Sequence, residues 1–179
     1  MRLHNGKIRM IGKIALGVLG IGAIAYGAFC LALWRGQTRL IFYPQPPPAQ
    51  TPAEFGLFYE DVWIEVEEDT IHGWWIPHSN PQARTALVLH GNASNVETTL
   101  RWAKNLIAAD LALLIVDYRG YGRSSGPFPN EARVYADAAA AWQYLTQKRQ
   151  IPPSNIVVFG HSIGGAIAIE LARHHPTAG

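Results

Sequence analysis

Hydrophobic residues follow three patterns along the chain, and each pattern predicts a different kind of element. Residues 14–34 are a continuous apolar stretch without a charge, which as a helix at 1.5 Å per residue would be about 31 Å long. Residues 59–66 alternate between apolar and polar, as a half-buried strand does. A second strand is expected at 71–77, after the acidic turn 67–70, so the two are predicted to form an antiparallel hairpin.

Short unbroken apolar runs predict strands that are buried on both faces of a parallel sheet. Such runs lie at 85–89 and 111–116, and a shorter β-branched run at 156–159 predicts a further strand. A helix is expected to begin near Val96, after the first run, and another to extend from 129 to about 147, after the second. Because strands alternate with helices, the sequence predicts an α/β fold with a mainly parallel sheet.

The last of these runs leads directly into a G-x-S-x-G sequence at 160–164, and a helix-like segment follows at once. Strand, turn and helix around this sequence are the layout of a nucleophile elbow, in which a sharp turn exposes the serine hydroxyl. Glycine at both ends of the sequence leaves room for the turn. Ser162 is therefore predicted to be a nucleophile near the N–H groups of a helix N-terminus. An ordinary turn serine is the alternative.

Two glycine-containing loops are expected to face this serine, because α/β sheets place ligand sites at the carboxyl ends of their strands. The first loop reads HGNASN at 90–95. Gly91 allows its backbone to turn inward, so that an N–H near Asn92 can point at a developing oxyanion. His90 is interpreted as a structural residue that hydrogen-bonds neighbouring loops.

The second loop, DYRGYGRSSG at 117–126, contains three glycines and is expected to be tightly shaped. Its Asp117 and Arg119 are two residues apart. They are predicted to form a structural ion pair with each other and not to transfer protons.

Charge is distributed unevenly over the 179 residues, although the formal net charge is only +2. Every charged residue among the first 39 is basic: Arg2, Lys7, Arg9, Lys13, Arg35 and Arg39. The rest of the chain has more acidic than basic residues, so no nucleic-acid partner is predicted. The acidic turn 67–70 is expected to be solvated, and no metal or other cofactor is predicted. A lone cysteine, Cys30, excludes an intrachain disulfide.

The apolar stretch 14–34 is predicted to be a transmembrane anchor, because its length as a helix matches the hydrocarbon core of a bilayer. Residues 1–13 would be a basic N-terminal tail, and 35–55 a stiff proline-rich linker that holds the following domain off the membrane. The positive-inside bias places the N-terminus in the cytoplasm and the rest of the chain on the extracytoplasmic side. A cleaved signal peptide and a buried core helix are the alternatives.

Three motifs in register carry a resemblance to a known family: HGNASN, DYRGYGRSSG and, at 160–165, GHSIGG. Together they resemble the α/β-hydrolase superfamily and, more narrowly, its membrane-anchored Bem46-like serine hydrolases. The resemblance covers about residues 36–175. It implies that Ser162 forms an acyl-enzyme that water then hydrolyses. It also implies an oxyanion hole from the backbone N–H groups of Ile163 and of a residue at or beside Asn92. The implied substrates are small-molecule esters or thioesters, lipids or acylated proteins.

The resemblance is incomplete, because the triad acid and histidine of this superfamily follow the serine in the chain, and no Asp follows Ser162 here. His174 and His175 would lie about 18 Å along the helix, so they are predicted to be C-terminal helix cations. Residues 56–179 are expected to be a partial hydrolase domain, truncated after the nucleophile helix, with the acid and base beyond the given chain. The strand 156–159 would then be an exposed apolar edge.

Two classes of function remain open. The motifs favour a membrane-anchored serine hydrolase that resembles carboxylesterases, thioesterases or lipases. An acyltransferase or peptidase on the same fold is a variant of this reading. The alternative is a truncated, non-catalytic remnant or pseudoenzyme that lacks the triad Asp and His.

Overall fold

The computed structural model describes residues 2–179, with side chains from Met10 onward. The chain divides into two compact units, Met1–Ile41 and Phe42–Gly179. The first unit is one long helix, α1 (Arg2–Ile41). Within it, Met10–Ile41 is long and apolar enough to cross a membrane, and none of this window is buried against protein. The helix extends beyond the predicted 14–34 at both ends, because no proline precedes Pro44 to interrupt it.

The second unit is built on a five-stranded sheet with the strand order β1-β2-β4-β3-β5. Its strands are β1 (Glu60–Val66), β2 (Asp69–Ile76), β3 (Arg84–Leu89), β4 (Leu111–Val116) and β5 (Ile156–Gly160). Strand β3 pairs in parallel with β4 and β5, whereas β2 pairs antiparallel with β1 and β4. The sheet is therefore mixed, with β2 running against the other four strands. The predicted hairpin and the three other predicted strands are confirmed. Strands β3 and β4 are buried as expected, whereas β5 lies at the edge of the sheet and is only partly buried.

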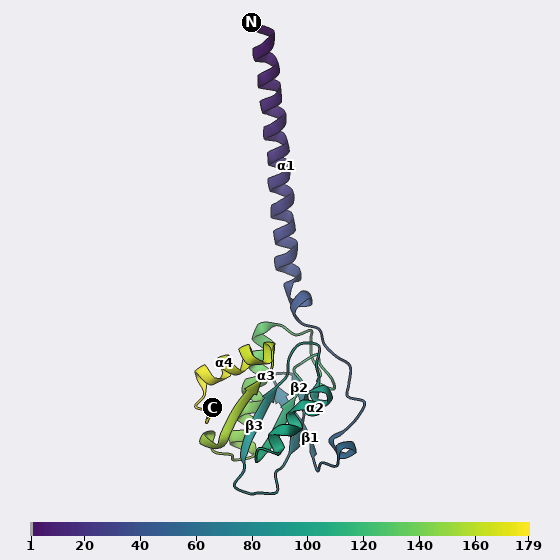
Figure 1. Ribbon diagram of the computed structural model, residues 1–179, viewed down its shortest axis with the longest axis vertical. Coiled ribbons are helices and arrows are strands. Elements are labelled where there is room, and N and C mark those ends of the chain that lie inside the picture. Colours follow the sequence, from purple (N-terminus) through teal and green to yellow (C-terminus); the bar gives the residue numbers. More distant parts are fainter. Residues whose placement is uncertain (1) are drawn as a thin grey trace. The chain divides into compact units, whose positions relative to one another are not determined.

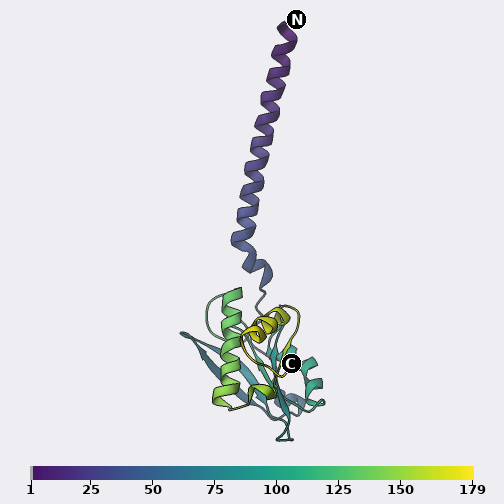
Figure 2. The ribbon, with the colours of Figure 1, turned by 90° about the vertical axis from the view of Figure 1, so that its left-hand side faces the viewer.

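Helices cover both faces of this sheet (Figures 1 and 2). Helix α2 (Val96–Ile107) packs on one face, and α3 (Glu131–Gln143) and α4 (Ile163–His174) pack on the other. Successive residues of β3 point to opposite faces: Ala86 and Val88 belong to the core under α2, and Leu87 and Leu89 to the core under α3 and α4. The predicted α/β architecture is confirmed.

The proline-rich stretch does not form a separate linker. Residues 35–41 continue α1, and the second unit begins at Phe42, whose side chain is only 7% exposed and belongs to the core. The backbone N–H of Gly122 donates to Gln45 O at 3.0 Å. Proline excludes helix and central strand, but it does not prevent an extended segment from packing on a surface. We call residues 42–50 the strap.

The outer edge of β5 is partly paired within the chain. Ala178 N donates to Ile156 O at 2.8 Å, and Val158 N donates to Gly179 O at 2.9 Å. Phe159 remains 39% exposed. The predicted apolar edge is therefore exposed near Phe159 and covered by backbone pairing nearer the start of the strand.

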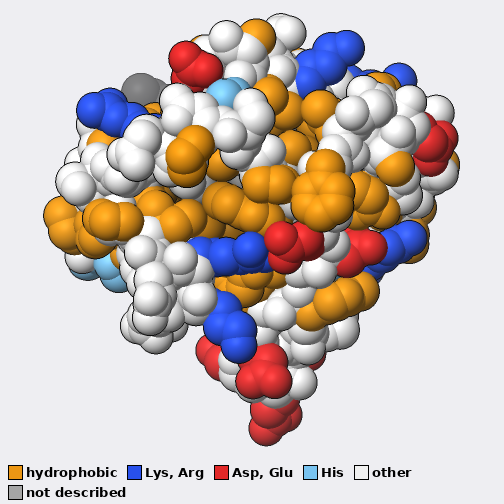
Figure 3. Space-filling model, turned by 90° about the horizontal axis from the view of Figure 1, so that it is seen from below, with side chains coloured by type: hydrophobic (Ala, Val, Ile, Leu, Met, Phe, Trp, Pro, Cys, Tyr) orange, Lys and Arg blue, Asp and Glu red, His pale blue; other side chains and the backbone are white. Residues whose placement is uncertain are grey.

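Charged side chains of both signs are mixed on the surface. Figure 3 shows Lys and Arg beside Asp and Glu across a face with much exposed hydrophobic surface, and acidic side chains gathered at one end of it. That face carries no continuous basic patch of the kind that follows a nucleic-acid backbone.

Candidate active site

Ser162 lies on a strained turn between β5 and α4. Its backbone has φ 55° and ψ −121°, in a region that side chains rarely adopt and that costs on the order of 1–3 kcal/mol. Gly164 N donates to His161 O and Gly165 N to Ser162 O, both at 2.9 Å, and these bonds close the turn. Ser162 is exposed. This is the strand, sharp turn and helix predicted for a nucleophile elbow.

Two glycines bring this turn against neighbouring backbone. A Cβ on Gly160 would lie 2.2 Å from Gly164 O, and a Cβ on Gly164 would lie 2.1 Å from Leu89 O. No real Cβ tolerates such contacts with backbone. Because both residues lack a side chain, the start of α4 can lie directly beside the end of β3.

The loop after β3 contacts the serine turn through a third glycine. A Cβ on Gly91 would lie 3.2 Å from Ser162 Cβ and 2.8 Å from His161 Nδ1. Asn92 follows directly, so the segment 90–95, which we call the oxyanion loop, passes beside the serine. The structure thus brings the two predicted parts of the site together.

The side chain of Asn92 is held by three donors. Its Oδ1 accepts hydrogen bonds from Tyr43 N at 2.7 Å, Ala93 N at 2.9 Å and Tyr121 Oη at 3.1 Å. These bonds fix the loop beside the serine. Sequence reasoning missed Tyr43 and Tyr121, because the first contributes only a backbone N–H and the second lies 29 residues away in the chain.

Ile163 is the first residue of α4. The first four N–H groups of a helix have no acceptor within it, so the Ile163 N–H is available at the serine. An anion that develops on a carbonyl carbon attacked by Ser162 would lie near this group and the backbone of Asn92. The roles of Ser162, Ile163 and Asn92 in catalysis stay predictions.

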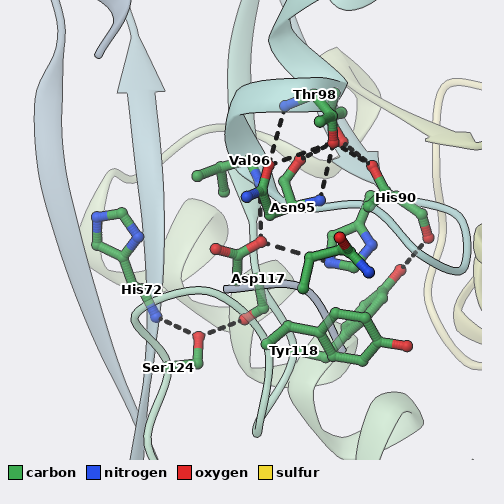
Figure 4. Close-up of polar contacts among 12 residues, drawn as sticks. His72, His90, Asn95, Val96, Thr98, Asp117, Tyr118 and Ser124 are labelled. Carbon is green, nitrogen blue, oxygen red and sulfur yellow. Dashed lines mark hydrogen bonds and ion pairs between the residues drawn. The ribbon is translucent and has the colours of Figure 1, made fainter. Parts of the chain in front are cut away.

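Two buried groups support the oxyanion loop from behind (Figure 4). His90 Nε2 lies 3.5 Å from Asp117 Oδ1, and both side chains are fully buried. His90 Nδ1 donates to Gly91 O at 2.8 Å, so Nε2 is the nitrogen without a proton in the neutral ring. Tyr118 Oη donates to His90 O at 3.0 Å. The prediction that His90 hydrogen-bonds neighbouring loops is confirmed.

Burial makes both members of this pair neutral near pH 7. It lowers the pKa of His90 to about 4 and raises the pKa of Asp117 to about 8. Asp117 Oδ1 still accepts from Val96 N at 2.8 Å. Asp117 therefore joins the loop after β4 to the start of α2, with His90 packed beside it, and the pair places no charge in the core.

The predicted ion pair between Asp117 and Arg119 is wrong. Arg119 Nε donates to Asp137 Oδ1 at 2.7 Å, and one terminal nitrogen of its guanidinium donates to Glu67 Oε2 at 2.7 Å. Strand β4 ends at Val116 and a turn begins at Arg119, so the strand geometry does not relate the two side chains. Asp117 accepts from Val96 N at the start of α2, whereas Arg119 reaches Asp137 on α3.

The histidines near the serine in sequence do not form a triad with it. His174 and His175 lie at the C-terminal end of α4, as predicted, and His174 Nε2 is 3.0 Å from Glu170 Oε1. His161 is exposed on the serine turn itself. Across the described residues there is also no group of three His, Cys, Asp or Glu side chains that could hold a metal ion.

Comparison with known proteins finds one family model, described as serine aminopeptidase S33, that matches residues 80–179. An uncharacterised protein of Mycobacterium tuberculosis is 34% identical over 166 residues, which are 92% of this chain and 59% of that protein. Protein bem46 of Schizosaccharomyces pombe is 32% identical over 85% of this chain and 54% of its own length. The chain thus spans less than two thirds of these relatives.

Solved structures show the same fold. An α/β hydrolase from Vibrio vulnificus aligns with a TM-score of 0.60 at 32% identity, over 68% of this chain and 41% of that one. An esterase from Pyrococcus furiosus aligns with a TM-score of 0.61 at 26% identity, over 76% of this chain and 53% of that one.

The close approach of α4 to β3 can be tested with two neighbouring glycines. We predict that Gly164→Ala lowers the free energy of unfolding by about 1–3 kcal/mol, because the new Cβ meets backbone that cannot move aside. Gly165→Ala is the control: the nearest atom to its Cβ would be Gly160 O at 3.7 Å, and alanine favours the helix by up to about 1 kcal/mol. Urea unfolding in detergent compares the variants. Equal free energies of unfolding for the two variants would contradict the close contact between α4 and β3.

The neutral pair predicts a dependence of stability on pH. Asp117 has a folded pKa of about 8, above its unfolded value, so its stabilising contribution is complete at low pH and is lost as the pH rises toward 8. The pKa of His90 is lowered from 6.5 to about 4, so between these two values this histidine makes the stability rise with pH and offsets the loss from Asp117. We therefore expect stability to fall between about pH 6.5 and 8.

Asp117→Asn is the matched variant for this test, because it keeps an oxygen for Val96 N and removes the titrating proton. We expect urea unfolding of the variant to show no fall in stability over this interval. The same fall in both proteins would show that another group causes it.

Proposed function

Because the chain belongs to the α/β-hydrolase family, we propose that it carries the nucleophile part of a membrane-anchored serine hydrolase that acts on esters or thioesters. The observation that carries the proposal is the strained, exposed Ser162 beside Gly91 of the oxyanion loop. Backbone strain of this kind persists only where the surrounding structure enforces it, and it is common at active sites.

In the proposed reaction Ser162 Oγ attacks the acyl carbonyl and gives its proton to a histidine base. The N–H groups of Ile163 and Asn92 stabilise the oxyanion, and the alcohol or thiol leaves with the proton from the base. Water then attacks the acyl-enzyme by the same route in reverse and releases the acid. This chemistry requires no cofactor.

The acid and the histidine are not assigned to residues of this chain. The relatives extend well beyond the part matched here, and we infer that both groups come from the corresponding sequence. Loops after further parallel strands would reach the same carboxyl edge of the sheet as Ser162. The alternative is a pseudoenzyme in which Ser162 has no histidine base.

An ester substrate is preferred to a peptide for a specific reason. The Pyrococcus furiosus structure of similar fold is described as an esterase and is 26% identical, whereas the aminopeptidase description belongs to a family model as a whole.

The helix α1 is proposed to anchor the protein in the membrane with its N-terminus in the cytoplasm, since the basic residues before 14–34 outnumber those just after it.

Labelling of the native protein with a fluorophosphonate tests the proposal. We expect covalent labelling at Ser162, complete loss in Ser162→Ala, and unchanged labelling in Ser154→Ala, which removes an exposed serine elsewhere on the surface. Failure of the native protein to react would instead support the pseudoenzyme. Equal labelling of Ser162→Ala would show that another residue is the nucleophile.

A further inference from the structure

The strap bonds directly to the oxyanion loop. Tyr43 N donates to Asn92 Oδ1 at 2.7 Å, and Asn95 Nδ2 donates to Pro46 O at 3.0 Å. The third and the last residue of the six-residue loop are therefore tied to the segment that follows α1. One of these bonds reaches the same Asn92 that lies beside the nucleophile.

A carboxylate on α2 secures the far end of the strap. Glu97 Oε2 accepts from Ala49 N at 2.7 Å and from Gln50 N at 3.2 Å. The hydrogen bond from Arg101 lowers the pKa of Glu97 and keeps it ionised, although burial opposes this. Together with the buried Phe42, these contacts leave the strap no freedom to act as a flexible spacer.

The chain between α1 and the oxyanion loop is consequently very short. Helix α1 ends at Ile41, and consecutive Cα atoms are 3.8 Å apart, so Tyr43 lies within about 8 Å of the helix end. Residues 35–41, between the charge-free stretch and that end, add about 10 Å of helix. These limits come from the chain alone and hold for every orientation of the two units.

A free linker would allow a larger distance between the end of α1 and the oxyanion loop. If residues 42–55 behaved as a flexible coil, they would add roughly 20 Å of reach between the helix and the domain. The strap is instead bonded to the domain from its first residues. The short segment 35–43 therefore keeps the oxyanion loop within roughly 20 Å of the edge of the hydrocarbon core. The headgroup layer takes up about 5–8 Å of that distance.

We propose that this short tether holds the oxyanion loop at the membrane surface and that the substrate is an acyl ester or thioester whose acyl chain lies in the bilayer. The proposal rests on the function proposed above and specifies its substrate class. The ester groups of such molecules lie at the border of the hydrocarbon core, so little displacement brings them to Ser162. Tyr43, which is 67% exposed, has the amphipathic ring favoured at membrane interfaces.

The position of the loop can be measured without any activity. The full chain with Cys30→Ser is placed in phosphatidylcholine vesicles, and a fluorophore is attached at Ala93→Cys in the oxyanion loop. A quencher on the lipid headgroups is expected to quench it strongly. A fluorophore at Gln82→Cys, before β3 and about 20 Å along the strand direction, is expected to be quenched less.

Lengthening the tether provides the matched control. About 12 Gly and Ser residues inserted between Ile41 and Phe42 add roughly 20 Å of reach and leave the bonds of the strap intact. The insertion should remove most of the quenching at Ala93→Cys. Quenching that is no stronger at Ala93→Cys than at Gln82→Cys, or that survives the insertion unchanged, would overturn the proposed placement of the loop.

Hydrolysis by the native protein then tests the substrate class. The insertion should lower turnover of a long-chain fluorogenic ester in vesicles severalfold, because the local concentration of substrate at the site falls, and should leave a soluble short-chain ester unaffected. Equal effects on both esters would overturn the substrate assignment. If the parent protein hydrolyses neither ester, the proposed function is contradicted. The quenching experiment still tests the position of the oxyanion loop independently. A vesicle-bound lipid ester and an S-acylated peptide, compared directly, identify which source of acyl chain is used.

Discussion

The site depends on one close approach of backbone to backbone, that of helix α4 to the end of strand β3. Gly164 lies where a Cβ would be 2.1 Å from Leu89 O, so the turn before it must bend sharply and Ser162 is held at a φ of 55°. The strain is compensated by packing around it, not relieved. The exposure of Ser162 follows from this constraint, and the turn delivers the chain to Ile163, the first residue of α4, whose N–H has no acceptor within the helix.

The loops around the serine are fixed by groups that carry no charge near neutral pH. His90 and Asp117 are both buried, and each is driven toward its neutral form. In that state they orient the peptide of Gly91 without the cost of burying ions. On the outer side, the strap bonds to Asn92. The oxyanion loop is therefore held from the core and from the segment after α1 at the same time.

The sequence predicted the sheet, its helices and the serine turn, because their signals are local: apolar runs, proline and glycine positions, and G-x-S-x-G. It did not predict contacts that form only when distant segments meet. Arg119 pairs with Asp137 and Glu67 in place of its near neighbour Asp117. The proline-rich strap was expected to be a spacer, since its composition excludes helix but says nothing about the surface on which it packs.

The strained serine and the N–H groups beside it are expected to form an oxyanion site, which a structure of the phosphonylated protein would reveal. We predict phosphorus bonded to Ser162 Oγ, with the phosphoryl oxygen within hydrogen-bond distance of Ile163 N and Asn92 N, at about 2.7–3.1 Å. A phosphoryl oxygen directed away from both groups, or a phosphonate on another residue, would contradict the account.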